Sequence, residues 1–545
     1  MAQQVTGGDL VAAALEALGV EHVFGIVSVH NLPVYDAIRR RGRITTINSR
    51  HEQNAVHAAD AYARTTGRLG VAITSTGPGA ANAVPGLYEA AFSSSPVLMI
   101  TGQVETRFYG KGRGVLHEAE RQLPMLRSVT RRTESVARTG DIPDAILLAA
   151  ADALTGRPQP VAVEIPIDLQ YQATAAQRPE RPAIRRARPE PAALAAAAAE
   201  LSAAARPLIW AGGGVLAAGA PAELTALAER LQAPVVTTTE GRGAIAEDHP
   251  LAVGPHSDHA EVSAVIADAD VVLAVGTRFP AAGNRWVPVP SRLIHLDADH
   301  RVIGLNHPAS AELVGDALAG LQDLLAAVTG RGAEPEFTKR AQEAAARARA
   351  DGREKIGPDY RVIMDAIRET LPRTAPVVRD STVPAYRWGD RLLPILAPRT
   401  SVRPNSAAIG PGVPLAIGAA VGSGQPTVVI QGDGGLMLSV GELAVVAERK
   451  LPIVVCVFND RGYGVLRGIE ARQFDGRNFG VELTTPDFPA LAASMGVRAA
   501  RVADPAEFES RFREAVASGR PALLDIDLLA LSPLSLYGPR PAGPS

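Results

Sequence analysis

Two short stretches, Gly432-Asp433-Gly434 and Asn459-Asp460-Arg461-Gly462, decide the fold of this 545-residue chain. Each follows a β-branched apolar run, residues 427–430 for the first and residues 453–458 for the second. Such runs are typical of strands that are buried on both faces. The segment from Ser439, its candidate N-cap, to Arg449 has the composition of a helix. The sequence therefore predicts a strand, a crossover helix and a second strand.

The two predicted strands bring acidic residues to one place. Parallel strands joined by a right-handed crossover leave their loops together at the carboxyl edge of the sheet, so Asp433 and Asp460 become neighbours. Magnesium prefers carboxylate and carbonyl oxygens, and the amides of Gly434 and Gly435 can approach a diphosphate closely. We expect Asp433, Asp460 and the carbonyl of Gly462 to bind a metal ion. An ordinary glycine turn after a buried strand is the alternative.

These stretches and their separation resemble the thiamine diphosphate binding signature, which starts with Gly-Asp-Gly and ends in an Asn-containing segment. The family usually carries Asn-Asn where this chain has Asn459-Asp460, so Asp460 adds a negative charge. The resemblance extends over nearly the whole chain. It implies an α/β fold of three doubly wound parallel-sheet domains, which are pyrimidine-binding, central Rossmann-like and diphosphate-binding. It also implies thiamine diphosphate and Mg²⁺ as cofactors.

A second part of the chain, residues 50–64, is similar to the family's glutamate segment almost residue for residue. A thiamine enzyme needs a shielded carboxylate that holds a proton on the aminopyrimidine ring, away from the metal. Apolar residues recur at helical spacing after Glu52 and place it at the start of a helix. The resemblance implies that Glu52 is catalytic. A charge that only stabilises the helix N-terminus is the alternative.

Three further segments look like the family's cofactor loops. Residues 76–82 form a tight loop between a strand and a helix, although such a loop can bind any anion. Residues 406–414 resemble the loop beneath the pyrimidine ring, where Ile409 would bend the cofactor and Ala407 replaces the usual glycine. Residues 380–383 resemble a second diphosphate loop. The cofactor-binding residues implied are Glu52, Gly77, Pro78, Asn82, Ser381, Thr382, Ala407, Ile409, Gly432, Asp433, Gly434, Gly435, Asp460, Gly462, Tyr463 and Gly464.

The resemblance also implies domain boundaries. The pyrimidine-binding domain spans residues 1–180, the central domain 190–330 and the diphosphate domain 357–533, and residues 534–545 read as a disordered tail. Polar stretches at 177–191 and 330–358 predict linkers, and the alanine run that ends at Ala205 predicts a surface helix. Three domains suit the length, because a single core does not extend over 545 residues.

The composition of the chain limits the classes of partner that we expect it to bind and the compartment in which we expect to find it. A net charge of −2 with mixed signs argues against nucleic acid or an anionic membrane as a partner. The single cysteine, Cys456, falls in a predicted strand and cannot form an internal disulfide. The chain has no signal sequence and no apolar run of spanning length, so we expect a cytoplasmic protein. Because the family's glutamate and metal site meet across subunits, the resemblance implies a homodimer or homotetramer.

The central domain raises the question of a flavin. Residues 212–214 are a glycine cluster after a predicted strand, which is only a faint dinucleotide fingerprint. Flavin-carrying acetolactate synthases use this domain to bind FAD. Residues 280–286 depart from the pattern of those enzymes, so FAD is a weaker alternative here.

The cofactor implies that a 2-oxo acid loses carbon dioxide and that the enamine is then joined to a second carbonyl or protonated to an aldehyde. His30 and His117 are candidate catalytic residues, since a near-neutral imidazole can donate a proton or stabilise a carboxylate. For each, a histidine without a role is the alternative. Val27-Ser28 departs from the family's Phe-Gly-x-Pro-Gly loop beside the substrate. Residues 114–118 are closer to decarboxylases of larger or basic 2-oxo acids, such as guanidino-oxopentanoate decarboxylase.

Three functions follow from these residues. The first is an acetolactate synthase-like carboligase, and the second is a non-oxidative 2-oxo acid decarboxylase that releases an aldehyde. The third is a catalytically silent regulatory relative, against which the intact Glu52, Asp433 and Ile409 argue. A flavin oxidase is a weaker fourth.

Overall fold

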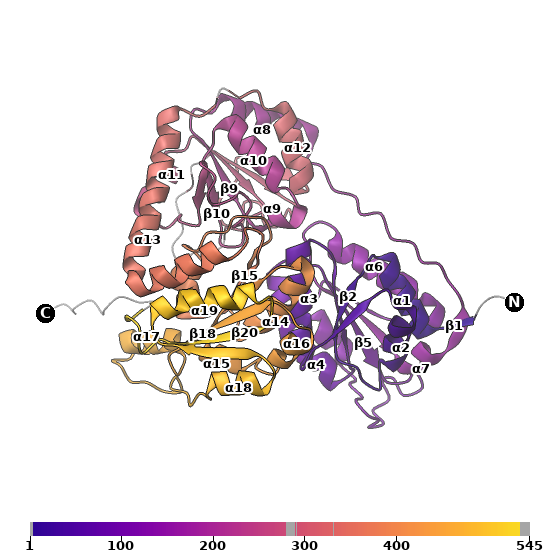
Figure 1. The fold of residues 1–545 in the computed structure, drawn as a ribbon. Helices are drawn as coiled ribbons and strands as arrows, with labels where there is room; N and C mark the ends of the chain where they lie inside the picture. The colour runs from indigo at the N-terminus through magenta and orange to yellow at the C-terminus, as the bar shows by residue number, and fades with distance from the viewer. Residues whose placement is uncertain (1–3, 280–288, 290–291, 331, 535–545) are drawn as a thin grey trace.

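The computed structural model describes residues 4–279, 289, 292–330 and 332–534. Three six-stranded sheets, each with all neighbouring strands parallel, form three lobes (Figure 1). A small antiparallel sheet pairs β1 (Gln4–Thr6) with β8 (Ala173–Ala175). The predicted class, three doubly wound α/β domains, is confirmed. Apart from residue 534, the predicted disordered tail lies outside the described residues.

The N-terminal lobe has the strand order β3-β2-β4-β5-β7-β6. The inner strands β4, β5 and β7 are buried throughout because helices cover the sheet on either side, whereas the edge strands β3 and β6 are polar and partly exposed. The strands are β2 (His22–Gly25), β3 (Thr45–Asn48), β4 (Gly70–Thr74), β5 (Val97–Gln103), β6 (Arg132–Ser135) and β7 (Val161–Pro166). The helices are α1 (Gly7–Ala17), α2 (Leu32–Arg41), α3 (Glu52–Thr66), α4 (Pro78–Phe92), α5 (Gln122–Arg127), the 3₁₀ turn η1 (Thr139–Asp141), α6 (Ile142–Leu154) and α7 (Ile167–Tyr171).

The central lobe has the order β11-β10-β9-β12-β13-β14, in which the direction of winding reverses beside β9. Its strands are β9 (Pro207–Ala211), β10 (Val235–Thr237), β11 (Ala252–Gly254), β12 (Val271–Val275), β13 (Leu293–Asp297) and β14 (Ala311–Val314). Its helices are α8 (Pro191–Ala203), α9 (Gly213–Ala218), α10 (Pro221–Leu231), α11 (Ala260–Asp268) and α12 (Ala317–Ala327). The helix predicted over the alanine run is α8.

The prediction of a polar linker at residues 330–358 is wrong for most of its length. Residues from Pro335 onward belong to α13 (Pro335–Thr370), which bends at Gly357, where φ is 80°. The first part of α13 packs alanines against the central lobe, and the second part belongs to the C-terminal lobe (Figure 1). The helix forms because Ala341, Ala344 and Ala348 recur at helical spacing and are buried together.

The C-terminal lobe has the order β16-β15-β17-β18-β20-β19, with Thr427 of β17 opposite Ile453 of β18. Its strands are β15 (Val377–Arg379), β16 (Ser401–Val402), β17 (Thr427–Gly432), β18 (Ile453–Asn459), β19 (Arg498–Val502) and β20 (Ala522–Asp527). Its helices are the π-helix η2 (Ala385–Gly389), α14 (Gly412–Ser423), α15 (Asp433–Met437), α16 (Glu442–Glu448), α17 (Gly464–Gln473), α18 (Phe488–Ser494) and α19 (Pro505–Ala517).

The predicted strands on either side of the crossover are present as β17 and β18, but the prediction of Ser439 as an N-cap is wrong. A short helix, α15, starts directly at Asp433, and the crossover helix α16 begins only after Gly441. The hydroxyl of Ser439 donates to the carbonyl of Gly410 instead (2.7 Å). Ser439 therefore ties the crossover to the loop that precedes α14.

The N-terminal and C-terminal lobes share one apolar core, which is centred on the contact between α3 and α14 (Figure 1). Small residues let the two helices approach closely. A Cβ atom on Gly418 would stand 1.9 Å from the carbonyl oxygen of Ala58. The position of α3, and of Glu52 at its start, therefore depends on a glycine in the opposite lobe.

We expect Gly418→Ala to destabilise the protein by about 3 kcal/mol, the upper part of the usual range for overpacking, because a backbone atom would have to move. Gly140→Ala is the matched control. A Cβ atom on Gly140 meets its nearest neighbour at 3.6 Å, so its melting temperature should stay close to the parent's. Equal melting temperatures for the two variants would show that α3 and α14 do not need this close approach.

Candidate active site

The carboxyl ends of β17 and β18 bring Asp433 and Asp460 together, as the parallel pairing of these strands requires. Asp433 is 1% exposed, and within the described residues neither carboxylate oxygen has a hydrogen-bond partner. Burial, and then the charge of Asp460, raise the pKa of Asp433 to about 7. Burial also raises the pKa of Asp460. The raised pKa values of two neighbouring carboxyl groups indicate an edge that favours binding of a cation.

The loop that carries Asp460 is held by a short antiparallel bridge. Gly462 pairs with Glu482, and the N–H of Tyr463 donates to the carbonyl of Val481 (2.9 Å). A Cβ atom on Gly462 would stand 2.2 Å from that same carbonyl oxygen, so only glycine fits. The bridge therefore fixes the backbone of Gly462, whose carbonyl is a predicted metal ligand.

Arg467, on α17, fixes the side chain of Asp460. Its guanidinium contacts Asp460 Oδ2 (3.1 Å) and Glu482 (2.8 Å). Gly464 packs on the other side, since a Cβ atom there would stand 2.1 Å from Asp460 Oδ2. Sequence reasoning missed Arg467, because Glu482 lies far along the chain and only the fold brings the three charges together.

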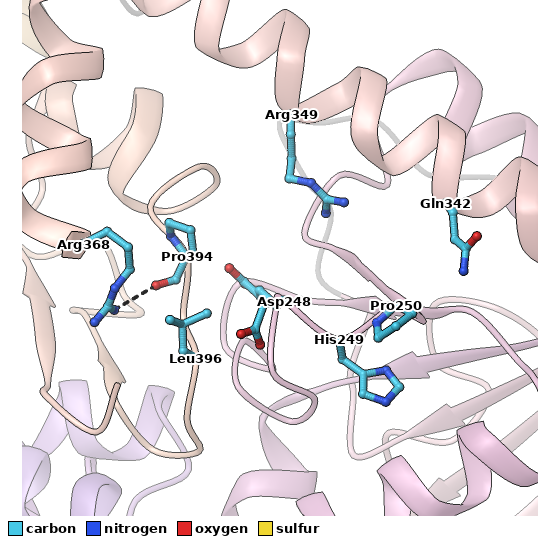
Figure 2. Close-up of a pocket in the computed structure, with 9 residues that line it drawn as sticks. Asp248, His249, Pro250, Gln342, Arg349, Arg368, Pro394 and Leu396 are labelled. Atoms are coloured by element: carbon cyan, nitrogen blue, oxygen red, sulfur yellow. Dashed lines mark hydrogen bonds between the residues drawn. The ribbon is translucent and has the colours of Figure 1, made fainter. Parts of the chain in front are cut away.

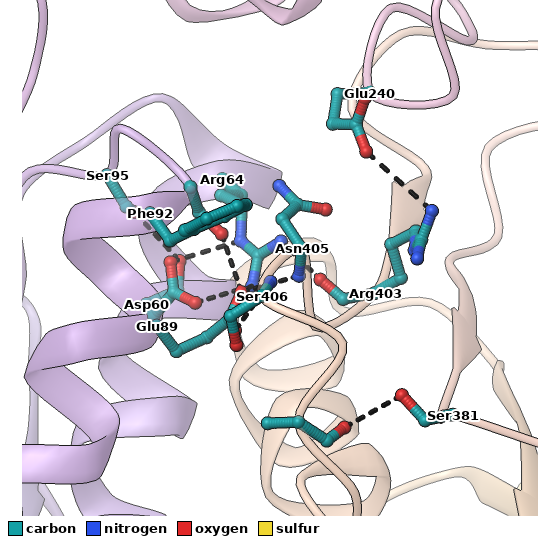
Figure 3. Close-up of polar contacts among 12 residues, drawn as sticks. Asp60, Arg64, Glu89, Phe92, Ser95, Glu240, Ser381, Arg403, Asn405 and Ser406 are labelled. Carbon is teal, nitrogen blue, oxygen red and sulfur yellow. Dashed lines mark hydrogen bonds and ion pairs between the residues drawn. The ribbon is translucent and has the colours of Figure 1, made fainter. Parts of the chain in front are cut away.

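The two other predicted loops of this lobe lie against each other. Asp380 is fully buried, and its carboxylate accepts from the N–H groups of Ser381 (2.7 Å) and Gly410 (3.0 Å) and from the amide of Gln431 (2.8 Å). Burial raises the pKa of Asp380 to about 6. The Ser381 hydroxyl donates to the carbonyl of Ala408 (2.9 Å; Figure 3). Sequence reasoning included Asp380 in its loop but missed that this side chain joins the two loops.

The remaining predicted residues of this lobe complete the same region. A Cβ atom on Gly435 would stand 2.9 Å from Asp380 and 3.5 Å from Ile409. One on Gly432 would stand 3.2 Å from the hydroxyl of Thr382, and one on Gly434 would meet the ring of Tyr463 at 2.7 Å. Glycines at these three positions therefore let the backbone after β17 pack closely against Asp380, Thr382 and Tyr463.

Ala407 has a backbone conformation that favours glycine. Its φ is 62°, in the left-handed region that L-residues with a Cβ atom rarely adopt. This conformation accounts for the glycine that is usual at the matching position of the family, and Ala407 bears a backbone cost of about 1 kcal/mol.

Glu89 holds this loop from the N-terminal lobe (Figure 3). Its carboxylate accepts from the N–H groups of Asn405 (2.6 Å) and Ser406 (3.1 Å) and from the Ser406 hydroxyl. Burial alone would raise the pKa of Glu89, but the charge of Arg64 and these hydrogen bonds lower it. Arg64 also donates to the carbonyl of Arg403 (2.6 Å). The loop before Ile409 therefore rests on α3 and α4.

Glu52 is the first residue of α3 and is 8% exposed. Its carboxylate accepts from the amide of Asn82 on α4 (3.1 Å). A Cβ atom on Gly79 would stand 2.8 Å from Glu52 Oε1, so the loop before α4 approaches the carboxylate closely. Within the described part of the single chain, no hydrogen bond or ion pair joins Glu52 to Asp433 or Asp460.

The two candidate histidines lie side by side, with ring centroids 5.0 Å apart. Burial, and then the charge of His117, lower the pKa of His30. Ser75 Oγ lies 2.8 Å from Ser28 Oγ and 3.5 Å from His117 Nδ1. Ser75 therefore links the loop that carries Ser28 and His30 to His117. Gly77 lies beneath His117, whose carbonyl oxygen would be 2.5 Å from a Cβ atom there, and Pro78 starts α4. Sequence reasoning missed Ser75, although Ser28 marked the loop as unusual.

Comparisons with known proteins agree with this geometry. Residues 5–125 match the N-terminal TPP binding domain of thiamine pyrophosphate enzymes, residues 194–324 the central domain, and residues 384–526 the C-terminal TPP binding domain. The chain belongs to the thiamine pyrophosphate enzyme family. Its cofactor, thiamine pyrophosphate, is the same compound as thiamine diphosphate.

Several relatives cover almost the whole chain. A probable acetolactate synthase large subunit of Methanocaldococcus jannaschii is 33% identical over 95% of this chain and 91% of the relative. A probable 2-ketoarginine decarboxylase of Pseudomonas aeruginosa is 35% identical over 96% of this chain and 94% of the relative. The large subunit of acetolactate synthase isozyme 3 of Escherichia coli is 30% identical over 94% of this chain and 92% of the relative. Both predicted groups, the acetolactate synthases and the 2-oxo acid decarboxylases, are represented.

The residues at the carboxyl edge of β17 and β18 fit the cofactor of this thiamine pyrophosphate enzyme. Two carboxylates and a main-chain carbonyl are hard oxygen donors of the kind that Mg²⁺ takes. The described residues contain no cluster of three or more His, Cys, Asp or Glu side chains that could hold a metal. The metal ion would therefore need oxygens from the backbone and from the diphosphate as well as from Asp433 and Asp460.

The central lobe gives no support to a flavin. A Cβ atom on Gly212 would stand 2.2 Å from the carbonyl oxygen of Gly276, and one on Gly214 would stand 2.6 Å from its Cα. This glycine cluster serves close packing of α9 against the loop after β12. Residues 280–286, whose sequence argued against FAD, lie outside the described residues.

The pKa of Asp433 predicts a pH dependence. Because metal binding must displace the proton from this carboxyl group, affinity for Mg²⁺ should fall by up to about tenfold per unit as the pH drops below 7. The Asp433→Asn variant should bind Mg²⁺ weakly, and its affinity should change less with pH than that of the parent. The pH dependence that remains in the variant comes from the cofactor phosphates. Titrations with Mg²⁺ from pH 5.5 to 8 at saturating thiamine diphosphate measure this. Equal slopes for parent and variant would contradict the assignment.

The raised pKa of Asp433 also predicts how the stability of the folded protein changes with pH. The folded-state pKa of Asp433 lies above its unfolded value of about 4, so folding takes up a proton between these values. The metal-free protein should therefore lose stability as the pH rises from about 4 to about 7, and Mg²⁺ with cofactor should reverse that loss. Melting temperatures measured over this pH range, with and without Mg²⁺, test this expectation. A metal-free melting temperature in Asp433→Asn that changes with pH as the parent's does would contradict the prediction.

Proposed function

We propose that the protein decarboxylates a 2-oxo acid with thiamine diphosphate and Mg²⁺ and joins the remaining acyl unit to a second carbonyl, as in acetolactate formation. The observation that carries the proposal is the buried Glu52 carboxylate at the start of α3, with the amide of Asn82 as its partner. A silent relative has no need to bury an acid beside a glycine loop, since burial without function costs stability. Acetolactate synthases similar to almost the whole chain give the reaction class.

Each predicted residue has a role in this proposal. The cofactor supplies the reactive carbon that makes loss of carbon dioxide feasible. Glu52 holds a proton on the aminopyrimidine ring, and Asp433, Asp460 and the Gly462 carbonyl hold Mg²⁺. Ile409 supports the bent cofactor. The other proposed cofactor contacts are Gly77, Pro78, Asn82, Ser381, Thr382, Ala407, Gly432, Gly434, Gly435, Tyr463 and Gly464.

His30 and His117 are proposed to face the substrate. Their paired rings can hold a substrate carboxylate when one is protonated, or donate a proton to the reacting unit. The lowered pKa of His30 keeps its ring neutral near pH 7.

A second function, release of an aldehyde from a larger or basic 2-oxo acid, is favoured by one relative and one feature of the site. The probable 2-ketoarginine decarboxylase is 35% identical over 96% of this chain. Release of an aldehyde requires a proton at the carbon that has lost carbon dioxide, whereas joining that carbon to a second carbonyl does not. The two adjacent imidazoles provide this proton.

We further propose a cytoplasmic homodimer or homotetramer in which Glu52 of one subunit completes the site around Asp433 of another. We also propose that the protein binds neither nucleic acid nor a membrane. No described helix is long and apolar enough to cross a membrane. The proposed domains are residues 1–180, 190–330 and 357–533. A shared site agrees with the finding that, among the described residues, no hydrogen bond or ion pair joins Glu52 to Asp433.

Product analysis separates the two functions. The protein with thiamine diphosphate and Mg²⁺ is given pyruvate, branched, aromatic and guanidino 2-oxo acids, and carbon dioxide and products are measured. Acetolactate or a mixed acyloin supports the first function, and aldehyde from one larger acid supports the second. No carbon dioxide from any acid would contradict both.

Glu52→Gln should lower turnover by at least about a hundredfold, because the amide cannot hold the ring proton in the same way. Affinity for thiamine diphosphate should change little, since the diphosphate end carries most contacts. Glu21→Gln, which alters an exposed carboxylate paired with Arg68, is the control and should keep normal turnover. Near-normal turnover of Glu52→Gln with saturating cofactor would remove Glu52 from the mechanism.

A further inference from the structure

A cavity of about 510 Å³ lies between the central and C-terminal lobes, away from the residues assigned above (Figure 2). Three parts of the chain line it. The loop at residues 247–250 comes from the central lobe, and residues 394–396 come from the C-terminal lobe. Arg349 and Arg368 come from the two parts of α13, on either side of the bend at Gly357. The cavity therefore spans the joint between the lobes.

The acids in this cavity are already neutralised. Glu247 accepts from both sides of the guanidinium of Arg242 (2.6 and 2.8 Å), which is completely buried, and from the N–H of Ile395 (2.9 Å). Asp248 pairs with Arg373. Each carboxylate is thus already paired with an arginine other than Arg349 and Arg368.

The two arginines that line the cavity, Arg349 and Arg368, make no ion pair within the described residues, although Glu247 and Asp248 lie near enough for their charges to act on them. Arg349 is half-buried, points from α13 into the space above Asp248 (Figure 2), and makes no hydrogen bond or ion pair within the described residues. Burial lowers the pKa of Arg349, and the charge of Glu247 offsets that effect only in part. Arg368 donates only to main-chain carbonyls, those of Leu371, Pro372 and Pro394. A half-buried guanidinium without a partner is costly unless an anion supplies one.

We propose that this cavity binds a small anion that carries a carboxylate or a phosphate group, held by Arg349 and Arg368. The planar fork of a guanidinium matches the two oxygens of either group. The exposed amide of Gln342 on the same helix is a further donor at the rim. The cavity is large enough for a metabolite of several carbons, and its occupant would fasten the two parts of α13 and both lobes to one another.

The test uses the full chain saturated with thiamine diphosphate and Mg²⁺, so that the diphosphate site is filled. Inorganic phosphate and malonate are titrated by calorimetry. Malonate is a dicarboxylate without a 2-oxo group and cannot enter the reaction. Saturable binding of phosphate alone, malonate alone or both supports the site and identifies which oxyanion it prefers. Binding of neither probe at millimolar concentration would overturn the proposal.

Two variants on the same helix make the test specific. Arg349→Met should weaken binding by at least about tenfold, the effect of losing a charged hydrogen-bond donor, and Arg349→Lys should restore part of it. Arg347→Met, which removes an exposed arginine paired with Glu261, should bind as the parent does. Melting temperatures without probe verify that the variants fold. Equal binding by Arg349→Met and the parent would overturn the proposal.

Discussion

The parallel pairing of β17 with β18 is the constraint from which the rest of the site follows. It brings Asp433 and Asp460 to the same edge of one sheet, where Asp433 is buried and Asp460 is partly exposed. Burial raises the pKa of Asp433 to about 7 and also raises the pKa of Asp460, so this edge favours binding of a cation. Arg467 supplies part of that charge to Asp460, and Asp433 is left with two unpartnered oxygens. In the proposed site, a divalent ion and its diphosphate would complete the arrangement.

The N-terminal lobe supports this edge from the other side of the shared core. α3 and α4 carry Glu52 and Asn82 at one end, and Arg64 and Glu89 near the other end hold the loop that precedes Ile409. The same two helices therefore position both the proposed catalytic acid and one of the proposed cofactor loops. The close contact of α3 with α14, which Gly418 permits, transmits this alignment between the lobes.

The sequence was most informative where local pattern and chemistry coincide. The β-branched runs predicted β17 and β18, and the segment after Glu52 predicted α3, because a buried strand and an amphipathic helix each leave a period in the sequence. α13 was mistaken for a linker because its many charges and its Gly-Pro pair outweighed the alanines at 341, 344, 345 and 348, although that spacing was visible. The Arg467–Glu482 and Glu89–Ser406 contacts leave no local signal, since only the folded chain brings their partners together.

A crystal structure of the protein grown with thiamine diphosphate and Mg²⁺ tests the central claim most directly. The account predicts Mg²⁺ about 2.1 Å from oxygens of Asp433 and Asp460 and from the Gly462 carbonyl, with the diphosphate completing the shell. It also predicts the Glu52 carboxylate of a second subunit beside the aminopyrimidine ring. A metal ion bound elsewhere, or an aminopyrimidine ring without Glu52 beside it, would contradict the account.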